Sequence, residues 1–290
     1  MTRAAPVARP TAARGLRGGA ADIGRAAVLA LHDELALTPK PGLVTPVDAG
    51  SHDDMDAHTF MRSLFALRHY FVEIAGAGFD GAGFDMLERC GIAAEARMRA
   101  ATGGVNTHRG AIFMLGLLCA AAGAALRAHG AIDSPQAVRD ALRRHWGEAL
   151  ARRSRRAPVL PGGIAARRLG LRGAAQEAAL AFPIVFETAV PALRAGLARG
   201  LSARLARLDT LFHVMAVLDD SNLAHRGGLA GLRDVQAMAR GFLARGGSAR
   251  PDGLAHARAI AAHCVARRLS PGGAADTLAA ACWVLRVTER

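Results

Sequence analysis

The chain has 290 residues, of which 51% are hydrophobic and only 4% aromatic, and its formal net charge is +13. Ala, Leu and Arg favour helices, and β-branched runs of strand length are scarce. We therefore expect an all-α fold with a single multi-helix globular domain. The positive charge points to an anionic partner. One tyrosine and arginines spread over helix faces argue against the basic, aromatic array of a nucleic-acid binder.

The four cysteines form no C-x-x-C pair, which argues against disulfides and zinc and favours a reducing cytoplasm. The longest apolar run, 111–126, is shorter than the roughly 20 residues that span a bilayer, so it predicts a buried helix and no membrane span. The first twenty residues are rich in Arg, Ala and Gly, with no apolar signal-peptide core. We expect residues 1–20 to be a disordered extension and 21–290 to be the folded domain.

Apolar residues recur at helical spacing along the chain. The first helix stops before Pro39, and a long polar loop over 38–56 follows; loops of this length in compact domains are usually functional or disordered. Asp56 is placed to cap the second helix. Residues 151–173 and 219–228 are Gly-rich and are predicted as loops. The predicted helices cover 22–37, 57–75, 84–101, 111–126, a stretch from Pro135, 174–181, 184–199, 201–218, 229–244, 252–269 and a last stretch opened by 270–276.

Lys40 is the only lysine in the chain, and it stands between two prolines in the 38–56 loop. Every other basic residue counted with it is arginine, so this position favours a compact ammonium over a planar guanidinium. An ammonium of this kind suits a phosphate oxygen or a crowded polar site. The alternative is the chance survival of one codon on a surface loop.

A Gly-rich segment precedes the apolar helix. Glycines let a backbone approach a ligand, and the N–H groups of a helix start favour anions, so the segment predicts phosphate binding. It lacks the G-K-[ST] ending of a Walker A loop. A plain glycine turn is the alternative. The candidate phosphate-binding residues are Gly103, Gly104, Asn106 and Thr107, with His108 and Arg109 as cationic donors.

Two further segments combine acids with cationic residues. Asp54 and Asp56, with His52 nearby, have the chemistry of a Mg²⁺ site or a general base; capping by Asp56 explains only one of these acids. The segment 219–228 offers Asp220 as a further metal ligand, and an arginine beside glycines that suits phosphate. The alternative there is a helix C-cap. Its candidate phosphate-binding residues are His225, Arg226, Gly227 and Gly228.

With these residues assembled, the chain resembles the triphosphoribosyl-dephospho-CoA synthase family. The resemblance covers nearly everything after residue 20, and its motifs are long and unusual. Ala174 stands where the family pattern has a glutamate, which puts a role for an acid at that position in doubt. The matching segments are 34–70 (with PKPGLV and HDDMD), 102–123 (with GGVNTHRG), 220–228 (DSNLAHRGG) and 270–276 (SPGGAAD).

The resemblance implies an all-α transferase that uses ATP and 3′-dephospho-CoA. The triphosphoribosyl group would move to the 2′ hydroxyl and adenine would leave. The product, 2′-(5″-triphosphoribosyl)-3′-dephospho-CoA, would be the prosthetic-group precursor for the acyl carrier protein of malonate decarboxylase, or, as the second choice, of citrate lyase. The resemblance also implies Mg²⁺ and a carrier-protein loading enzyme that takes the product, and it leaves room for a homodimer.

This chemistry passes through an oxocarbenium-like ribosyl centre and needs a carboxylate as base or stabiliser. We expect Asp54, Asp56 and Glu34 to be catalytic, and Asp54, Asp56 and Asp220 to hold Mg²⁺. The triphosphate is retained, so Lys40 and the two Gly-rich segments are expected to clamp it, with His108 or His225 as a donor to adenine.

Two other functions fit parts of the sequence. One is a Mg²⁺-dependent hydrolase of an ADP-ribosyl or nucleotide N-glycosidic bond, in which water replaces the ribose hydroxyl. The other is an anion-binding module without catalysis, suggested by the positive charge. The acids at 53–56 and 219–220 argue against a polyanion lying across that face.

Overall fold

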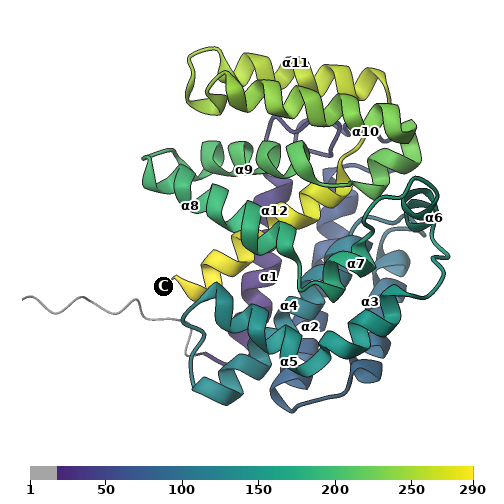
Figure 1. Ribbon diagram of the computed structural model, residues 1–290, viewed down its shortest axis with the longest axis vertical. Coiled ribbons are helices and arrows are strands. Elements are labelled where there is room, and N and C mark those ends of the chain that lie inside the picture. Colours follow the sequence, from purple (N-terminus) through teal and green to yellow (C-terminus); the bar gives the residue numbers. More distant parts are fainter. Residues whose placement is uncertain (1–17, 290) are drawn as a thin grey trace, which may run out of the picture.

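A computed structural model describes residues 18–289, which are mostly helical and contain no strand within that range (Figure 1). The predicted all-α fold is confirmed. The α-helices are α1 (Ala20–Leu35), α2 (Ala57–Phe79), α3 (Phe84–Ala101), α4 (Arg109–His129), α5 (Pro135–Ser154), α6 (Pro161–Arg168), α7 (Ala174–Ala179), α8 (Val190–Ala198), α9 (Ala203–Val217), α10 (Ser221–Ala244), α11 (Gly253–Ala266) and α12 (Gly272–Thr288), with a π-helical turn over Ile184–Ala189 and a 3₁₀ turn over Gly247–Ala249.

Helix α4 forms the centre of the core and packs against α1, α2, α3, α5 and α12. It has the length and hydropathy of a membrane span, but 83% of that window is buried inside the protein. Two glycines bring α2 and α4 into backbone contact. A Cβ added to Gly78 would lie 2.0 Å from the carbonyl oxygen of Ala120, and one added to Gly123 would lie 2.0 Å from that of Ala75. This apolar helix is therefore a buried core helix.

The first and last described helices pack directly against each other. The indole Nε1 of Trp283 in α12 donates to the backbone oxygen of Ile23 in α1, and both side chains are fully buried. Helix α12 therefore lies within the core, between α1 and the α8–α9 pair, with its N-terminus near the start of α10 (Figure 1).

Two of the predicted loops are wrong in part: within 151–173 only 155–160 and 169–173 are non-helical, and within 219–228 only 219–220 are. Within 151–173, helix α5 continues to Ser154 and α6 follows, because Gly162 lies in a first helical turn where it allows close packing: its added Cβ would be 3.2 Å from Ser221 Oγ. Within 219–228, helix α10 begins at Ser221 and continues through a kink at Gly228, whose backbone has φ 63° and ψ −165°. In both segments glycine lies within a helix and does not end it.

The loop over 36–56 is confirmed as non-helical and is bound to distant parts of the chain. Ser51 Oγ donates to the carbonyl oxygen of Leu269 at 2.7 Å. Gly42 has a positive φ of 63°, and a Cβ there would lie 1.9 Å from the same carbonyl oxygen. The predicted extension over 1–20 falls largely on residues 1–17, which lie outside the described residues, and α1 already begins at Ala20.

Candidate functional site

Three helix N-termini meet at one place in the fold: those of α4, α10 and α12. The carboxylate of Asp220, which caps α10, also accepts from the backbone N–H of Ala274 in α12 at 3.0 Å. The carboxylate of Asp276 in α12 lies against Gly110 in the first turn of α4. Because each helix N-terminus carries partial positive charge, this junction favours anions and charged carboxylates. We call six residues around it the central polar cluster: Glu34, Lys40, Ser63, His108, Asp220 and Asp276.

Lys40 reaches the cluster from the 36–56 loop. Its Nζ donates to Glu34 Oε1 at 2.5 Å and to the Glu34 backbone oxygen at 2.8 Å, at the end of α1. Lys40 is 3% exposed and Glu34 is 4% exposed. Burial lowers the pKa of Lys40, and the Glu34 carboxylate opposes that change. The ammonium therefore neutralises a buried carboxylate and fixes the loop to α1.

His108 lies directly before α4 and is buried. Its Nδ1 shares a 2.6 Å hydrogen bond with Ser63 Oγ from α2, and the Phe60 ring contacts its edge. Burial, followed by the charge of Lys40, lowers the pKa of His108 to about 3, so the imidazole is neutral at physiological pH. Its Nε2 and the neighbouring Thr107 Oγ1 are buried without a hydrogen-bond partner in the described part of the protein. Unpartnered buried groups of this kind are costly unless a ligand satisfies them.

Asp220 is buried, and both of its carboxylate oxygens bind backbone N–H groups. Oδ1 accepts from Asn222 and Leu223, and Oδ2 accepts from Ala274. Burial raises the pKa of Asp220 to about 6, although these hydrogen bonds oppose the rise. Asp220 therefore joins α10 to α12, and both of its carboxylate oxygens are already hydrogen-bonded.

Asp276 is a cluster residue that our site prediction omitted. It is half-buried, while Gly110 beside it is exposed. Burial, followed by the nearby carboxylates of Glu34 and Asp220, raises the pKa of Asp276 well above its ordinary value; a hydrogen bond from the Ala111 N–H opposes the rise. The SPGGAAD segment contained this residue, but an acid near the start of a helix is commonplace in a sequence. Only the fold reveals its two acidic neighbours.

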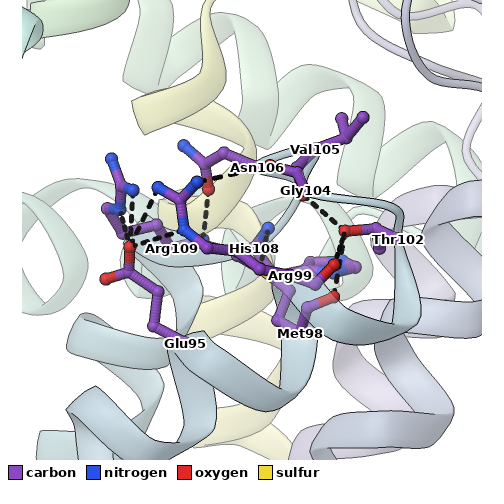
Figure 2. A network of polar contacts seen from close by, with 9 residues as sticks. All are labelled: Glu95, Met98, Arg99, Thr102, Gly104, Val105, Asn106, His108 and Arg109. Atoms are coloured by element: carbon purple, nitrogen blue, oxygen red, sulfur yellow. Dashed lines mark hydrogen bonds and ion pairs between the residues drawn. The ribbon is translucent and has the colours of Figure 1, made fainter.

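Figure 2 shows the loop between α3 and α4, which holds the predicted Gly-rich residues. Gly103 and Gly104 are exposed, with φ of 65° and 93°, and a Cβ on either would meet no neighbouring atom. Glycine is therefore favoured at these two positions by the positive φ of the backbone. Close contact with a neighbouring atom plays no part. Asn106 Oδ1 accepts from the Arg109 N–H at 3.2 Å, and the Arg109 guanidinium binds Glu95 Oε1, which Arg99 shares. We call the partly exposed surface around the central polar cluster its rim. An ion pair thus holds Arg109 at this rim.

The predicted metal ligands are not grouped in the structure. Asp56 caps α2, with its Oδ1 accepting from the Thr59 N–H at 2.8 Å, and that hydrogen bond lowers the pKa of Asp56. Asp54 is exposed, and its nearest ionic neighbour is His52 at 3.9 Å. Asp220 is committed to backbone N–H groups. Within residues 18–289, no three His, Cys, Asp or Glu side chains form a metal-binding group.

The predicted residues on α10 lie beside the 36–56 loop. Arg226 donates from Nη1 to the backbone oxygens of Ser51 and Arg268, and its Nη2 lies 3.1 Å from His52 Nδ1. His225 is exposed. Gly227 packs against Leu269, where a Cβ would lie 2.5 Å from Cδ2, and Gly228 forms the kink. Both glycines therefore have structural reasons to be there.

Comparisons with known proteins match nearly the whole length of the chain. The family described as ATP:dephospho-CoA triphosphoribosyl transferase matches residues 20–290. Three relatives are each named "Probable 2-(5''-triphosphoribosyl)-3'-dephosphocoenzyme-A synthase". The protein from Acinetobacter calcoaceticus is 38% identical over 89% of this chain and 88% of its own length. Those from Vibrio cholerae serotype O1 (strain M66-2) and Citrobacter koseri are 39% and 37% identical, over 91% and 90% of this chain and 87% and 88% of their own lengths.

No solved structure matches the chain. The family match covers all but the first nineteen residues, and the relatives are covered over nearly their whole length. The chain therefore belongs to the ATP:dephospho-CoA triphosphoribosyl transferase family and is a transferase of that family.

Proposed function

We propose that this protein transfers the triphosphoribosyl group of ATP to the 2′ hydroxyl of 3′-dephospho-CoA and releases adenine. The observation that carries the proposal is the meeting of three helix N-termini at a buried cluster of three carboxylates, a lysine and a neutral imidazole. Carboxylates serve a ribosyl transfer as base and as stabilisers of an oxocarbenium-like centre. The near full-length match to a family of this activity supports it.

The triphosphate is retained in this reaction, so the protein has to bind it without cleaving it. The exposed loop of Gly103, Gly104 and Asn106 lies before α4, whose first N–H groups favour anions, and Arg109 stands beside it. The N–H of Gly104 itself is bound to the Arg99 carbonyl oxygen. Arg226 and His225 supply cationic donors on the other side of the junction, with Gly227 and Gly228 following them. Lys40 contributes its positive charge from within the cluster, because its Nζ is committed to Glu34.

We propose that Mg²⁺ arrives with ATP as part of the substrate. The donor set we expected for it, Asp54, Asp56 and Asp220, does not fit a preformed protein site, because Asp56 and Asp220 are capping residues and the three are not grouped. Mg²⁺ usually keeps several waters and binds through substrate phosphates and one or two carboxylates. For MgATP bound at the α4 N-terminus, the phosphates, waters and one or two carboxylates are therefore enough to coordinate the ion.

His108 has the geometry for a hydrogen bond to the leaving adenine or to the ribose. Its neutral ring is fixed by Ser63 at one nitrogen, and the other nitrogen has no partner among residues 18–289. An imidazole with a pKa of about 3 does not carry a proton to adenine at physiological pH, so its contribution would be a directed hydrogen bond and not a charge.

The product is a prosthetic-group precursor for the acyl carrier protein of either malonate decarboxylase or citrate lyase. We propose malonate decarboxylase as the destination, in preference to citrate lyase, with a carrier-protein loading enzyme as the next step. A cytoplasmic location fits four free, buried cysteines among the described residues. We also propose that the protein forms a homodimer, which a molar mass measured by light scattering tests.

The decisive experiment is mass analysis of the product formed from ATP, Mg²⁺ and 3′-dephospho-CoA. A mass gain equal to triphosphoribose, with one adenine released per product, is the expected result. Adenine release that does not depend on dephospho-CoA would instead show a hydrolase. Binding of nucleic acid in a salt-sensitive gel shift, with no adenine released, would show an anion-binding module.

The predicted catalytic acids at the rim have their own test. Asp54→Asn and Asp56→Asn are each expected to impair turnover if these acids hold MgATP or act as base. The matched control is Asp252→Asn, an exposed acid beside the N-terminus of α11. Turnover equal to wild type in both variants would assign Asp56 to capping alone and Asp54 to the solvated surface.

A further inference from the structure

If the proposed function holds, one carboxylate of the protein has to take the proton of the acceptor hydroxyl. A general base needs an oxygen that the protein leaves free and that a substrate can reach. Within the central polar cluster, Glu34 gives its Oε1 to Lys40 and is buried, and Asp220 gives both oxygens to backbone N–H groups. Glu34 is therefore ion-paired and closed off from a substrate, and Asp220 has both oxygens engaged.

The two rim acids are also poorly placed for this task. Asp56 is exposed and holds the N–H and hydroxyl of Thr59 with Oδ1. Those hydrogen bonds lower the pKa of Asp56 and make it a weaker base. Asp54 is exposed on the 36–56 loop and has no hydrogen-bonded support, so nothing fixes its carboxylate toward a reacting atom.

Asp276 combines a carboxylate held in place with access for a substrate. It stands on the first turns of α12, and its Oδ2 lies over Gly110, so closely that a Cβ on Gly110 would be 1.8 Å away. Gly110 is exposed and Asp276 is half-buried, so the carboxylate lies directly beneath the exposed first turn of α4, where a ligand bound at that turn would meet it. Burial, and after it the acidic neighbours Glu34 and Asp220, disfavour its charged form, which strengthens it as a proton acceptor.

We propose that Asp276 is the general base that accepts the proton of the dephospho-CoA 2′ hydroxyl. The bond between C1′ of the ATP ribose and N9 of adenine breaks, and adenine keeps the electron pair. A bond forms between that C1′ and the 2′ oxygen, and the hydroxyl proton moves to an Asp276 oxygen. Adenine takes one proton from solvent as it leaves and Asp276 returns its proton to solvent, so the protons balance and no other reactant is needed.

The first test is Asp276→Asn, which keeps the shape and removes the base. The turnover number should fall by about 10²- to 10⁴-fold, the usual contribution of a general base, with KM for both substrates changed less than about threefold. In wild type, turnover should rise with pH along an acid limb set by Asp276, and this limb should be missing from the residual rate of the variant. Turnover near wild type, or an unchanged acid limb, would overturn the assignment.

The second test moves the carboxylate without replacing it. Gly110→Ala introduces a methyl group that occupies the present position of Asp276 Oδ2, on an exposed turn where alanine suits a helix. We expect a loss of turnover with the helical circular dichroism retained. Gly147→Ala on α5 is the matched control, because its Cβ would meet nothing within 4 Å. Full turnover in Gly110→Ala would overturn the proposal even where Asp276→Asn fails to fold.

These outcomes are separate from the fate of the proposed function. If wild type forms no triphosphoribosyl product, the reaction itself is wrong. If wild type forms the product and both the Asp276 and Gly110 variants keep pace with it, the reaction stands and the base lies elsewhere.

Discussion

Lys40 donates from one ammonium to two oxygens of a single residue, Glu34: the carboxylate Oε1 at 2.5 Å and the backbone carbonyl at 2.8 Å. The carbonyl belongs to the last turn of α1, where backbone oxygens lack helical partners and a cation is favoured. One side chain therefore neutralises a buried acid and caps a helix end. This pairing explains why a compact ammonium is kept in a chain whose other basic residues are arginine.

Lys40→Arg keeps the charge but introduces a larger, planar group into a site that is 3% exposed. We expect this change to cost about 1–3 kcal/mol of stability through overpacking and to impair ATP use. Urea denaturation and the KM for ATP measure the two effects. Lys40→Met should cost more, about 3–5 kcal/mol, because it leaves the Glu34 carboxylate buried and unpaired. If Lys40→Arg matched wild type in both measurements, the single lysine would be an accident of composition.

Asp220 makes stability depend on pH in a defined direction. Burial raises its pKa from 3.8 to about 6, so folding favours the protonated form. Its contribution is fully present below about pH 4 and is lost as pH rises through about 6. The free energy of unfolding of wild type relative to Asp220→Asn should fall by roughly 3 kcal/mol across that window. Urea titrations at about pH 4.5 and pH 7.5 test this; a difference that grows with pH would contradict it.

His108 should stay neutral throughout the physiological range. Its pKa is about 3 in the folded protein, below the ordinary value of 6.5, so the stability it contributes is present above pH 6.5 and is lost as pH falls toward 3. The ¹⁵N shifts of its ring should not change between about pH 5 and pH 8. His108→Gln assigns the signals by their loss. A titration midpoint near 6.5 would show that the ring is solvated and free of Ser63.

Gly228 forms the kink in α10, with a φ of 63° that strains any residue with a Cβ. Gly228→Ala should lower the free energy of unfolding by about 1–3 kcal/mol. Gly147→Ala, in the interior of α5 with open space around it, should raise that free energy by about 0.5–1 kcal/mol. Equilibrium urea unfolding compares them. Equal effects in the two variants would mean that α10 is not kinked at Gly228.

The helical class and most helix positions could be predicted because apolar spacing decides them locally: α3 matches its prediction residue for residue, and α4 begins two residues early. The two wrong loops share a cause. Gly162 packs against Ser221, far along the chain, and Gly228 kinks α10 without ending it, so neither glycine terminates a helix. The cluster also depends on such neighbours. The motifs predicted Glu34, Lys40, His108 and Asp220, but Asp276 owes its raised pKa to burial and then to two carboxylates brought in by other helices.

The packing of α1 against α12 has a consequence for synthesis of the protein on the ribosome. Trp283 reaches Ile23 across 260 positions of the chain, and Asp276 lies on the same final helix. The apolar face of α1 and the carboxylate cluster cannot close until the last helix has left the ribosome. A nascent chain that stops short of α12 therefore exposes its central helices and lacks part of the proposed reaction centre, so folding of the core waits until α12 has emerged from the ribosome.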